Sequence, residues 1–438
     1  METGKTIAVV GLNASGKTQY IERLRRRLAS DRVRYIAFCD SYGVATDRAY
    51  YLQLRWNQHD IDEETPTVGS KLEQVFLQTG KDTAERRIYQ QRLYHMFAME
   101  KELDKYLILL SSGELRKYQL VKHLLSHPSI LILDNPFIGL DVDSRILLRD
   151  LLATLVREEH LTVYLLLSKA EDVPSYTDEI IYMTPEDSFS AEPQGLSIES
   201  KKLLLNLPPN AHTSKSKEII RMNDVCIRYG KRQILNNLNW VIYEGEHWSL
   251  SGPNGCGKST LLSLISADNP QAYACDISLF GNQRGSGETI WEIKSRIGYV
   301  SPEMHRSYQR NLPSLQVVAS GIKDTIGLYV RPNATEREKC LWWMRLFGIE
   351  DLASRSFMEI SSGEQRMVLL ARAFVKDPEL LILDEPMHGL DLHRQKLVKD
   401  IIETFCKRPH KTLIFVTHYL GELPSCIDHH LTLPKIQQ

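Results

Sequence analysis

The stretch Gly252-Pro-Asn-Gly-Cys-Gly-Lys-Ser259 decides the fold class of this 438-residue chain. It follows a strand-like run, His247 to Leu250, and its last two residues open a helix-like segment. A strand, a glycine-rich turn and a lysine at a helix start form a phosphate-binding loop, because backbone N–H groups in the turn surround the anion. The pattern recurs at Gly11-Leu-Asn-Ala-Ser-Gly-Lys-Thr18, after Ile7 to Val10. The sequence therefore predicts two nucleotide sites.

The residues of each loop have separate predicted roles. Lys17 and Lys258 should reach the terminal phosphates, and Thr18 and Ser259 should hold Mg²⁺. The residues predicted to bind ATP through the loops are Asn13, Ala14, Ser15, Gly16, Lys17 and Thr18 in the first copy and Asn254, Gly255, Cys256, Gly257, Lys258, Ser259 and Thr260 in the second. Because anion-binding loops lower the pKa of thiols, alkylation of Cys256 should block binding at the second site.

Two apolar runs with polar ends differ at one position. Leu381-Ile-Leu-Asp-Glu-Pro386 ends in two carboxylates, whereas Leu131-Ile-Leu-Asp-Asn-Pro136 has an amide at the second place. Asp134 and Asp384 should meet the metal through water. Glu385 should polarise an attacking water, but an amide cannot accept a proton at neutral pH. The difference predicts one site that turns over and one that mostly binds.

A histidine follows a further apolar run in the second half only. His418 ends Phe415-Val-Thr-His418, where it should contact the terminal phosphate and the attacking water. The corresponding first-half stretch is Tyr164-Leu-Leu-Leu-Ser-Lys169, so Ser168 and Lys169 stand where the histidine is expected. Two catalytic positions, with Asn135 as the other, are therefore lost together in the first half.

A third element, Ser-Ser-Gly-Glu, also occurs twice with equal spacing. Its glycines, Gly113 and Gly363, each lie 21 residues before the aspartate that ends the acidic strand. The sequences Leu110-Ser-Ser-Gly-Glu114 and Ile360-Ser-Ser-Gly-Glu-Gln365 resemble the signature motif of ATP-binding-cassette (ABC) ATPases. The resemblance covers nearly the whole chain. Within this family, Ile290 to Glu303 and Tyr51 to Asn57 resemble soluble tandem proteins of the ModF or photorepair type.

The resemblance implies an α/β fold with two P-loop NTPase domains of the ABC type. Each would be a mostly parallel sheet flanked by helices, with a helical insert. The cassettes would pair head to tail as a pseudo-dimer, each ATP lying between one phosphate loop and the other signature. Site one would combine Lys17, Thr18, Asp134 and Asn135 with Ser361, Gly363 and Glu364. Site two would combine Lys258, Ser259, Asp384, Glu385 and His418 with Ser111, Gly113 and Glu114.

The halves differ at their N-termini. We expect domains at residues 1–185 and 217–438, joined by a Ser- and Pro-containing linker at 186–216. Some 35 residues precede the second phosphate loop, and they can build a small antiparallel sheet that the first half lacks. Tyr229, within them, could stack on the adenine of site two or pack in a core. For the glutamine that the family places near the metal, the candidates are Gln53 and, at the nearest second-half position, Glu303.

Composition excludes several function classes. The chain is 42% hydrophobic and 25% charged. Its net charge is −1, so the chain as a whole has no positive charge that would attract it to nucleic acid or anionic lipid. Seven scattered cysteines without CxxC spacing indicate a reducing compartment. Arg23, Arg25, Arg26 and Arg27 should form a solvated helix face. Without a secretory signal or an 18-residue apolar run, we expect a cytoplasmic protein, peripheral to the membrane's inner face if a partner holds it there.

Three kinds of process could use such an ATPase. A transport role, of the molybdate type by resemblance, would need a separate membrane subunit. That subunit would contact inserts 54–109 and 304–359, whose aromatics are interface or core residues: Trp56, Tyr94, Phe97, Trp342 and Trp343. A ribosome-associated translation factor would usually carry a longer, more charged linker. A DNA-repair ATPase would need a basic groove or coiled-coil inserts, so ribosome and nucleic acid are not favoured as partners.

Overall fold

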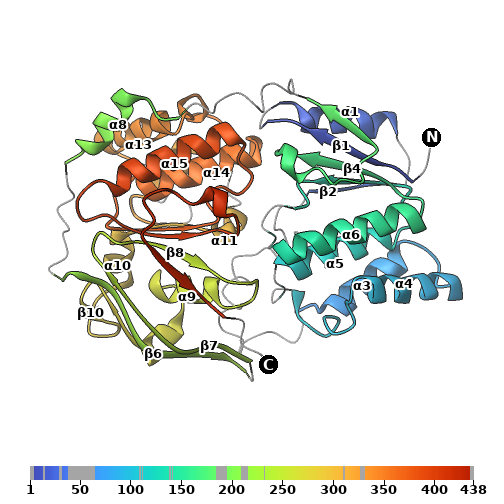
Figure 1. Cartoon of the computed structure of the whole chain (residues 1–438), viewed down its shortest axis with the longest axis horizontal. Coiled ribbons are helices and arrows are strands. Elements are labelled where there is room, and N and C mark those ends of the chain that lie inside the picture. Colours follow the sequence, from blue (N-terminus) through green and yellow to red (C-terminus); the bar gives the residue numbers. More distant parts are fainter. Residues whose placement is uncertain are drawn as a thin grey trace. The chain divides into compact units, whose positions relative to one another are not determined.

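The chain folds into two units, Met1–Glu192 and Pro193–Gln438 (Figure 1). The computed structural model describes residues 4–12, 15–28, 32–37, 65–107, 110, 112–137, 140, 142–183, 195–208, 216–230, 232–308, 311–325 and 331–434. The division falls inside the predicted linker. A helix within that stretch, α8 (Ile198–Leu205), belongs to the second unit, because Leu204 is fully buried in its core and Leu196 N–H donates to the Asp400 carboxylate at 3.0 Å.

The two units contain parallel sheets of the same topology. In the first unit the strand order is β2-β3-β4-β1-β5, and in the second it is β11-β12-β13-β8-β14. The first-unit strands are β1 (Thr6–Val10), β2 (Val33–Ala37), β3 (Ile130–Asp134), β4 (Thr162–Leu167) and β5 (Glu179–Tyr182). The second-unit strands are β8 (His247–Ser251), β11 (Ile297–Val300), β12 (Leu380–Asp384), β13 (Thr412–Val416) and β14 (His429–Thr432). The α/β fold with two P-loop domains is thereby confirmed.

The apolar runs form central strands because both faces of each sheet are covered. Along β12, Leu381 and Leu383 face one core cluster, whereas Leu380 and Ile382 face another. Side chains alternate between the two faces of a strand, so a strand buried on both sides must be apolar at every position. In β3 the same alternation divides Leu131 and Leu133 from Ile130 and Ile132.

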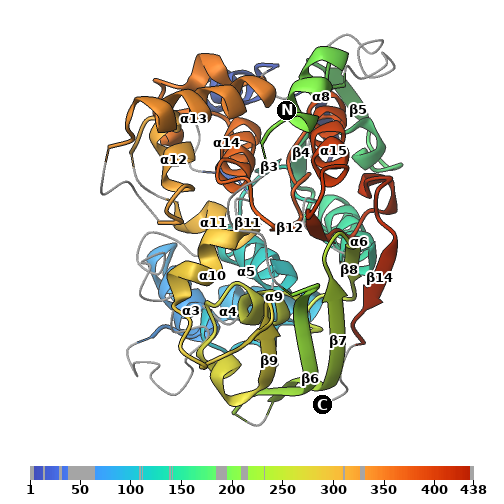
Figure 2. The same ribbon diagram turned by 90° about the vertical axis from the view of Figure 1, so that its left-hand side faces the viewer.

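Helices cover the sheets and form the inserts. The main ones are α1 (Lys17–Arg27), α3 (Val68–Gln78), α4 (Ala84–Met96), α5 (Ser112–Leu124) and α6 (Val142–Glu158) in the first unit, and α9 (Lys258–Ile265), α10 (Ile290–Arg296), α11 (Pro302–Ser307), α12 (Ser314–Ser320), α13 (Ala334–Leu346), α14 (Ser362–Phe374) and α15 (Leu392–Cys406) in the second. In Figure 2, α12, α13 and α14 lie above the second unit's parallel sheet, and α9 lies below it.

An antiparallel sheet distinguishes the second unit, as predicted. Its order is β10-β9-β6-β7, built from β6 (Glu218–Tyr229), β7 (Arg232–Tyr243), β9 (Asp276–Leu279) and β10 (Asn282–Gln283). Side chains from this sheet, α9 and the parallel strands share one core cluster. In the described part of the first unit, every strand belongs to the single parallel sheet.

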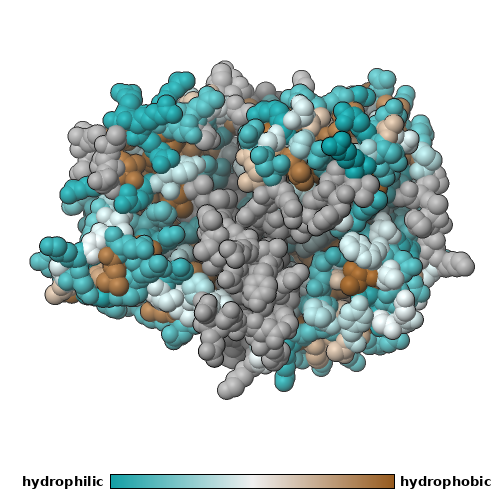
Figure 3. Space-filling view, turned by 180° about the vertical axis from the view of Figure 1, so that it is seen from behind, coloured by the Kyte–Doolittle hydropathy of each residue, from teal (hydrophilic) through white to brown (hydrophobic). Residues whose placement is uncertain are grey.

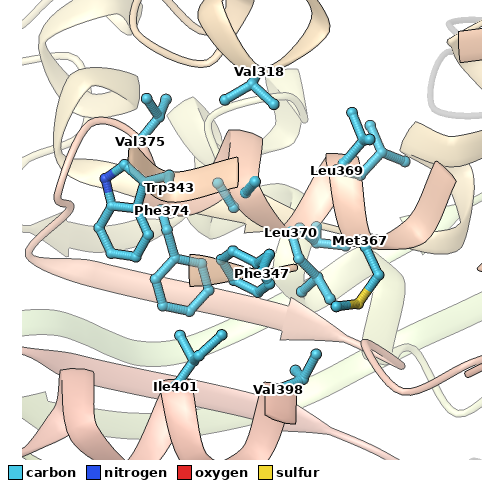
Figure 4. Close-up of a cluster of buried hydrophobic side chains, with 14 of the residues drawn as sticks. Val318, Trp343, Phe347, Met367, Leu369, Leu370, Phe374, Val375, Val398 and Ile401 are labelled. Atoms are coloured by element: carbon cyan, nitrogen blue, oxygen red, sulfur yellow. The ribbon is translucent and has the colours of Figure 1, made fainter. Parts of the chain in front are cut away.

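Most aromatic residues of the inserts belong to cores rather than to open surfaces. Tyr94, Phe97 and Trp343 are buried, and Trp342 is half-buried against the same cluster as Trp343. Figure 4 shows Trp343 of α13 beside Phe374 of α14, with Phe347 and the α15 residues Val398 and Ile401 in the same cluster. Trp56 lies outside the described residues.

One face of the molecule can be seen in a space-filling view (Figure 3). The described residues on the face in Figure 3 are mostly hydrophilic, and hydrophobic side chains show there as small separate patches. Among the described residues, helices that combine the length and the hydropathy needed to cross a bilayer are absent.

Candidate functional site

The sheet topology brings the predicted site residues of each unit to one edge. One strand, β4 or β13, separates the phosphate-loop strand from the strand that ends in Asp134 or Asp384. All these strands run parallel, so the phosphate loop, the acidic strand end and the residue after the separating strand meet at the carboxyl edge. Ligands of open α/β sheets bind at this edge. The arrangement is the same in the two units.

The phosphate loops end in glycines whose backbone leaves a helix N-terminus open. Helices α1 and α9 begin at Lys17 and Lys258, after Gly16 with φ 88° and Gly257 with φ 103°. This left-handed conformation is readily adopted by glycine. A glycine cap has no side chain to occupy the first N–H groups of the helix, so those groups can bind an anion.

Both loop lysines fold back onto their own loops. Lys17 Nζ donates to the carbonyl oxygens of Gly11 and, at 2.9 Å, Leu12. Lys258 Nζ donates to the equivalent carbonyls of Gly252 and Pro253, at 2.7 and 3.2 Å. The ammonium group of each lysine therefore lies directly over its loop, next to the place where a phosphate would bind. Asn13, Ala14 and the Thr18 side chain lie outside the described part of the chain.

The residue after each acidic strand adopts the same strained backbone in the two units. Asn135 has φ 50° and Glu385 has φ 49°. Their N–H groups donate to the carbonyls of Leu166 and Val416, at 2.9 Å in each case. Asparagine tolerates this left-handed conformation better than glutamate, for which it costs about 1–3 kcal/mol. The two side chains thus start from the same place, and only their chemistry differs.

In the first unit, Asn135 is held in a chain of hydrogen bonds. Ser168 Oγ donates to Asn135 Oδ1 at 3.1 Å, and Asn135 Nδ2 donates to Asp134 Oδ1 at 2.8 Å. Tyr35 Oη donates to the other Asp134 oxygen at 2.9 Å. Burial raises the pKa of the Asp134 carboxyl, although Tyr35, Lys17 and Asn135 act to lower it. The amide therefore serves the neighbouring carboxylate and offers no basic atom to a water.

In the second unit, Glu385 takes the position of Asn135, and an imidazole lies near each of its two carboxylate oxygens. His418 Nε2 is 3.4 Å from Glu385 Oε1, and His388 Nδ1 is 4.0 Å from Glu385 Oε2. The Glu385 side chain is 18% exposed, which leaves it open to a water. His388 was not among the sequence-predicted site residues. His388 could have been identified from the sequence, because it lies only three residues after Glu385, in the turn before Asp391.

The donor atoms available near the second loop fit magnesium. Ser259 and the buried Asp384 provide a hydroxyl and a carboxylate, the oxygen donors that Mg²⁺ takes together with substrate phosphates. Clusters of three or more His, Cys, Asp or Glu residues that could hold a metal by themselves are absent from the described residues. Gln53 and the Glu303 side chain lie outside the described residues.

The signature motif opens a helix in each unit. Ser361 caps α14, where its Oγ accepts from Glu364 N–H at 3.4 Å while Glu364 Oε2 accepts from Ser361 N–H at 2.8 Å. Burial acts to raise the pKa of Glu364, but the hydrogen bonds from Ser361 and the nearby Arg394 make the net shift a lowering. In α5, Glu114 accepts from Lys105 at 2.8 Å, and Ser111 precedes the described part of this helix.

The structure places Tyr229 partly in a core and buries Cys256 within the second phosphate loop. Tyr229 Oη accepts from Asn269 Nδ2 at 3.0 Å, and its ring packs partly against the antiparallel-sheet core. Cys256 is 3% exposed, and burial raises the pKa of its thiol although Lys258 acts to lower it. The expectation that the loop lowers this pKa is therefore wrong, because desolvation of the thiolate outweighs the attraction of the lysine.

Cys256 should consequently be a slow thiol. At pH 7.5 we expect iodoacetamide to modify the exposed Cys226 well before Cys256, and the Cys256 rate to keep rising as the pH is raised, because a raised pKa leaves less thiolate near neutrality. Peptide mass spectrometry after timed quenching measures both rates in one sample. Modification of Cys256 ahead of Cys226 at pH 7.5 would contradict this assignment.

Comparisons with known proteins agree with this geometry. Residues 1–138 and 235–388 match the ABC transporter family. The chain is 34% identical to the ABC transporter ATP-binding protein ModF of Escherichia coli, over 98% of this chain and 91% of ModF. It is 29% identical to the uncharacterised ABC transporter ATP-binding protein C323.04 of Schizosaccharomyces pombe, over 90% and 81%.

A solved structure shares the fold across nearly the whole chain. A model of ribosome-bound archaeal Pelota and ABCE1 matches with a TM-score of 0.59 at 17% identity, covering 99% of this chain and 74% of that one. At this identity the likeness shows the fold alone. With two matched segments, two phosphate loops and a relative similar along its full length, the chain belongs to the ABC transporter family, as an ATPase with tandem cassettes.

Proposed function

We propose that the second unit carries out nearly all ATP hydrolysis and that the first unit binds ATP with little turnover. The observation that carries this proposal is the contrast at one backbone position. Glu385 has His418 3.4 Å from its carboxylate, whereas the Asn135 amide is engaged by Ser168 and by Asp134. A carboxylate can accept a proton from water and an amide cannot.

Different residues of the second unit would act in different parts of the reaction ATP + H₂O → ADP + phosphate. The N-terminus of α9 and Lys258 bind the terminal phosphates and stabilise the charge that develops there. Glu385 orients the attacking water and accepts its proton, and His418 orients Glu385 and the γ-phosphate. Ser259 and Asp384 would hold Mg²⁺, which neutralises phosphate charge when bound. Tyr229 is proposed as the residue that stacks on the adenine.

The first unit keeps the binding elements and lacks the two groups that act on water. Lys17 donates to its own loop carbonyls as Lys258 does to the equivalent carbonyls of the second loop. Loss of a positioned base typically costs about 10²- to 10⁴-fold in rate. We therefore propose a holding site here, in which Thr18 and Asp134 would bind Mg²⁺.

The family resemblance supports a further part of the proposal. Ser111, Gly113 and Glu114 would complete the second nucleotide site, and the equivalent residues Ser361, Gly363 and Glu364 would complete the first. One chain would then form an intramolecular pseudo-dimer. Closing and opening of this pair would be the mechanical output of ATP hydrolysis.

The process driven is proposed to be transport. The support is the relative named ModF, an ABC transporter ATP-binding protein, which is similar along the whole chain. By the ModF-type resemblance the cargo would be of the molybdate type. A separate membrane subunit would form the pathway and hold this protein at the inner face of the membrane. Association with ribosomes is the alternative, and similarity of fold to the ABCE1 structures is its only support.

The first test replaces the proposed general base. Glu385→Gln should lower steady-state ATP hydrolysis by about 10²- to 10⁴-fold, because the amide cannot accept the proton of water. Equilibrium dialysis should still find two ATP per chain, since the phosphate loops are unchanged. The control, Glu359→Gln, changes an exposed glutamate in the same unit and should leave the rate at the wild-type value. A Glu385→Gln variant with wild-type turnover would rule out the proposal.

The second test restores the missing groups in the first unit. In the Glu385→Gln background, Asn135→Glu alone should stay near the background rate, because Ser168 cannot replace the histidine. Asn135→Glu with Ser168→His should raise phosphate release measurably above that background. A phosphate-binding fluorescent protein detects such slow rates. If the pair of substitutions gives no gain while ATP is still bound, these two residues are not what silences the first site.

A further inference from the structure

We propose that His388 is a positioning residue for Glu385, and that it acts by holding the buried guanidinium of Arg366 away from that carboxylate. This inference rests on the proposed role of Glu385 as the general base. His388 lies in the turn after β12, where its N–H donates to the Glu385 carbonyl at 3.1 Å. Arg366 lies on α14, three residues after Gly363 of the signature motif.

The contacts define what each atom does. Arg366 Nη2 is 3.2 Å from His388 Nδ1. A guanidinium can only donate, so Nδ1 must accept and the imidazole proton must lie on Nε2. The same Nδ1 is 4.0 Å from Glu385 Oε2, which is too long for a hydrogen bond. The imidazole thus accepts from the arginine while it stands next to the carboxylate.

This position matters because Arg366 is only 2% exposed. A buried guanidinium forms strong, often bidentate pairs with any carboxylate within its reach. Without an acceptor at Nδ1, the guanidinium could turn toward Glu385, whose Oε2 lies 4.0 Å from that nitrogen. A direct pair would turn Glu385 away from His418 and from the attacking water. His388 therefore gives the arginine another partner and leaves the carboxylate available.

The first unit provides an internal comparison. Arg116 occupies the same place after the signature motif in α5, and it is also buried. It donates to the backbone carbonyl of Pro136 at 3.0 Å. In that unit the residue equivalent to His388 is Ile138, and the residue equivalent to Glu385 is Asn135. The histidine accordingly accompanies the carboxylate, and an isoleucine accompanies the amide.

The test separates the Nδ1 acceptor from the rest of the side chain. His388→Asn places an amide oxygen near the Nδ1 position, so it should keep kcat close to the wild-type value. His388→Gln places its oxygen beyond Nδ1, and His388→Ile copies the first unit. These two variants should lower kcat by about 10- to 100-fold, the scale expected when a catalytic group is misplaced. The dissociation constant for ATP should stay unchanged in all three, since the substitutions leave both phosphate loops and their lysines intact.

The controls make each outcome informative. His429→Ile removes a half-exposed histidine on β14 of the same unit and should leave kcat unchanged, because its partners Asp428 and Trp248 are not among the proposed site residues. His388→Gln remains polar, so it keeps the test available if His388→Ile fails to fold. Wild-type kcat in His388→Gln, equal losses in the Asn and Gln variants, or a loss of ATP affinity in place of kcat would each overturn the proposal. Glu385→Gln measured alongside shows whether the proposed general base itself fails.

Discussion

The backbone hydrogen bond that follows each acidic strand is the constraint on which both sites depend. The N–H groups of Asn135 and Glu385 donate to the neighbouring parallel strand, and this bond holds both residues at positive φ. A single side chain is thereby projected over the carboxyl edge of the sheet, beside the phosphate loop. Glutamate gains no local stability from this conformation, so its presence at 385 is explained by what its carboxylate does there.

From one backbone geometry the chain builds two different sets of contacts. The first unit forms Ser168–Asn135–Asp134–Tyr35, in which each side chain is hydrogen-bonded to a neighbour. The second unit surrounds Glu385 with His418 and His388 and leaves the carboxylate partly open to water. A side chain that is hydrogen-bonded to its protein neighbours, as Asn135 is, suits a group that only needs to stay in place. A general base, in contrast, must keep an oxygen available for its substrate.

Much of this could be predicted from the sequence, because the decisive features are contiguous. The apolar runs before Asp134 and Asp384 and the two glycine-rich loops define parallel strands and the sheet edge at which they end. The equal 21-residue spacing of Gly113 and Gly363 from these aspartates matches the two halves to each other. The β6 and β7 strands of the antiparallel sheet were predictable from the length and strand-like pattern of the residues before Gly252. The strands β9 and β10 follow that loop and were not predicted, because β9 joins the sheet by pairing with the distant β6.

The features that could not be predicted depend on contacts between distant segments. Arg366 and His388 are 22 residues apart and meet only because α14 packs beside the turn after β12. The direction of the Cys256 pKa shift depends on how deeply the loop is buried, and a motif does not contain that information. The docking of α8 on the second unit likewise needs Asp400 of α15, about 200 residues further along the chain.

A single-turnover experiment on the unmodified protein tests the division of labour most directly. Radiolabelled ATP is mixed with the protein at two ATP per chain and at concentrations that fill both sites, the reaction is quenched at a series of times, and the bound nucleotide is counted as ATP or ADP. The account predicts that about half of the bound label becomes ADP rapidly while the other half remains ATP, because only one of two occupied sites has a general base. Conversion of all the bound label in one phase would contradict it.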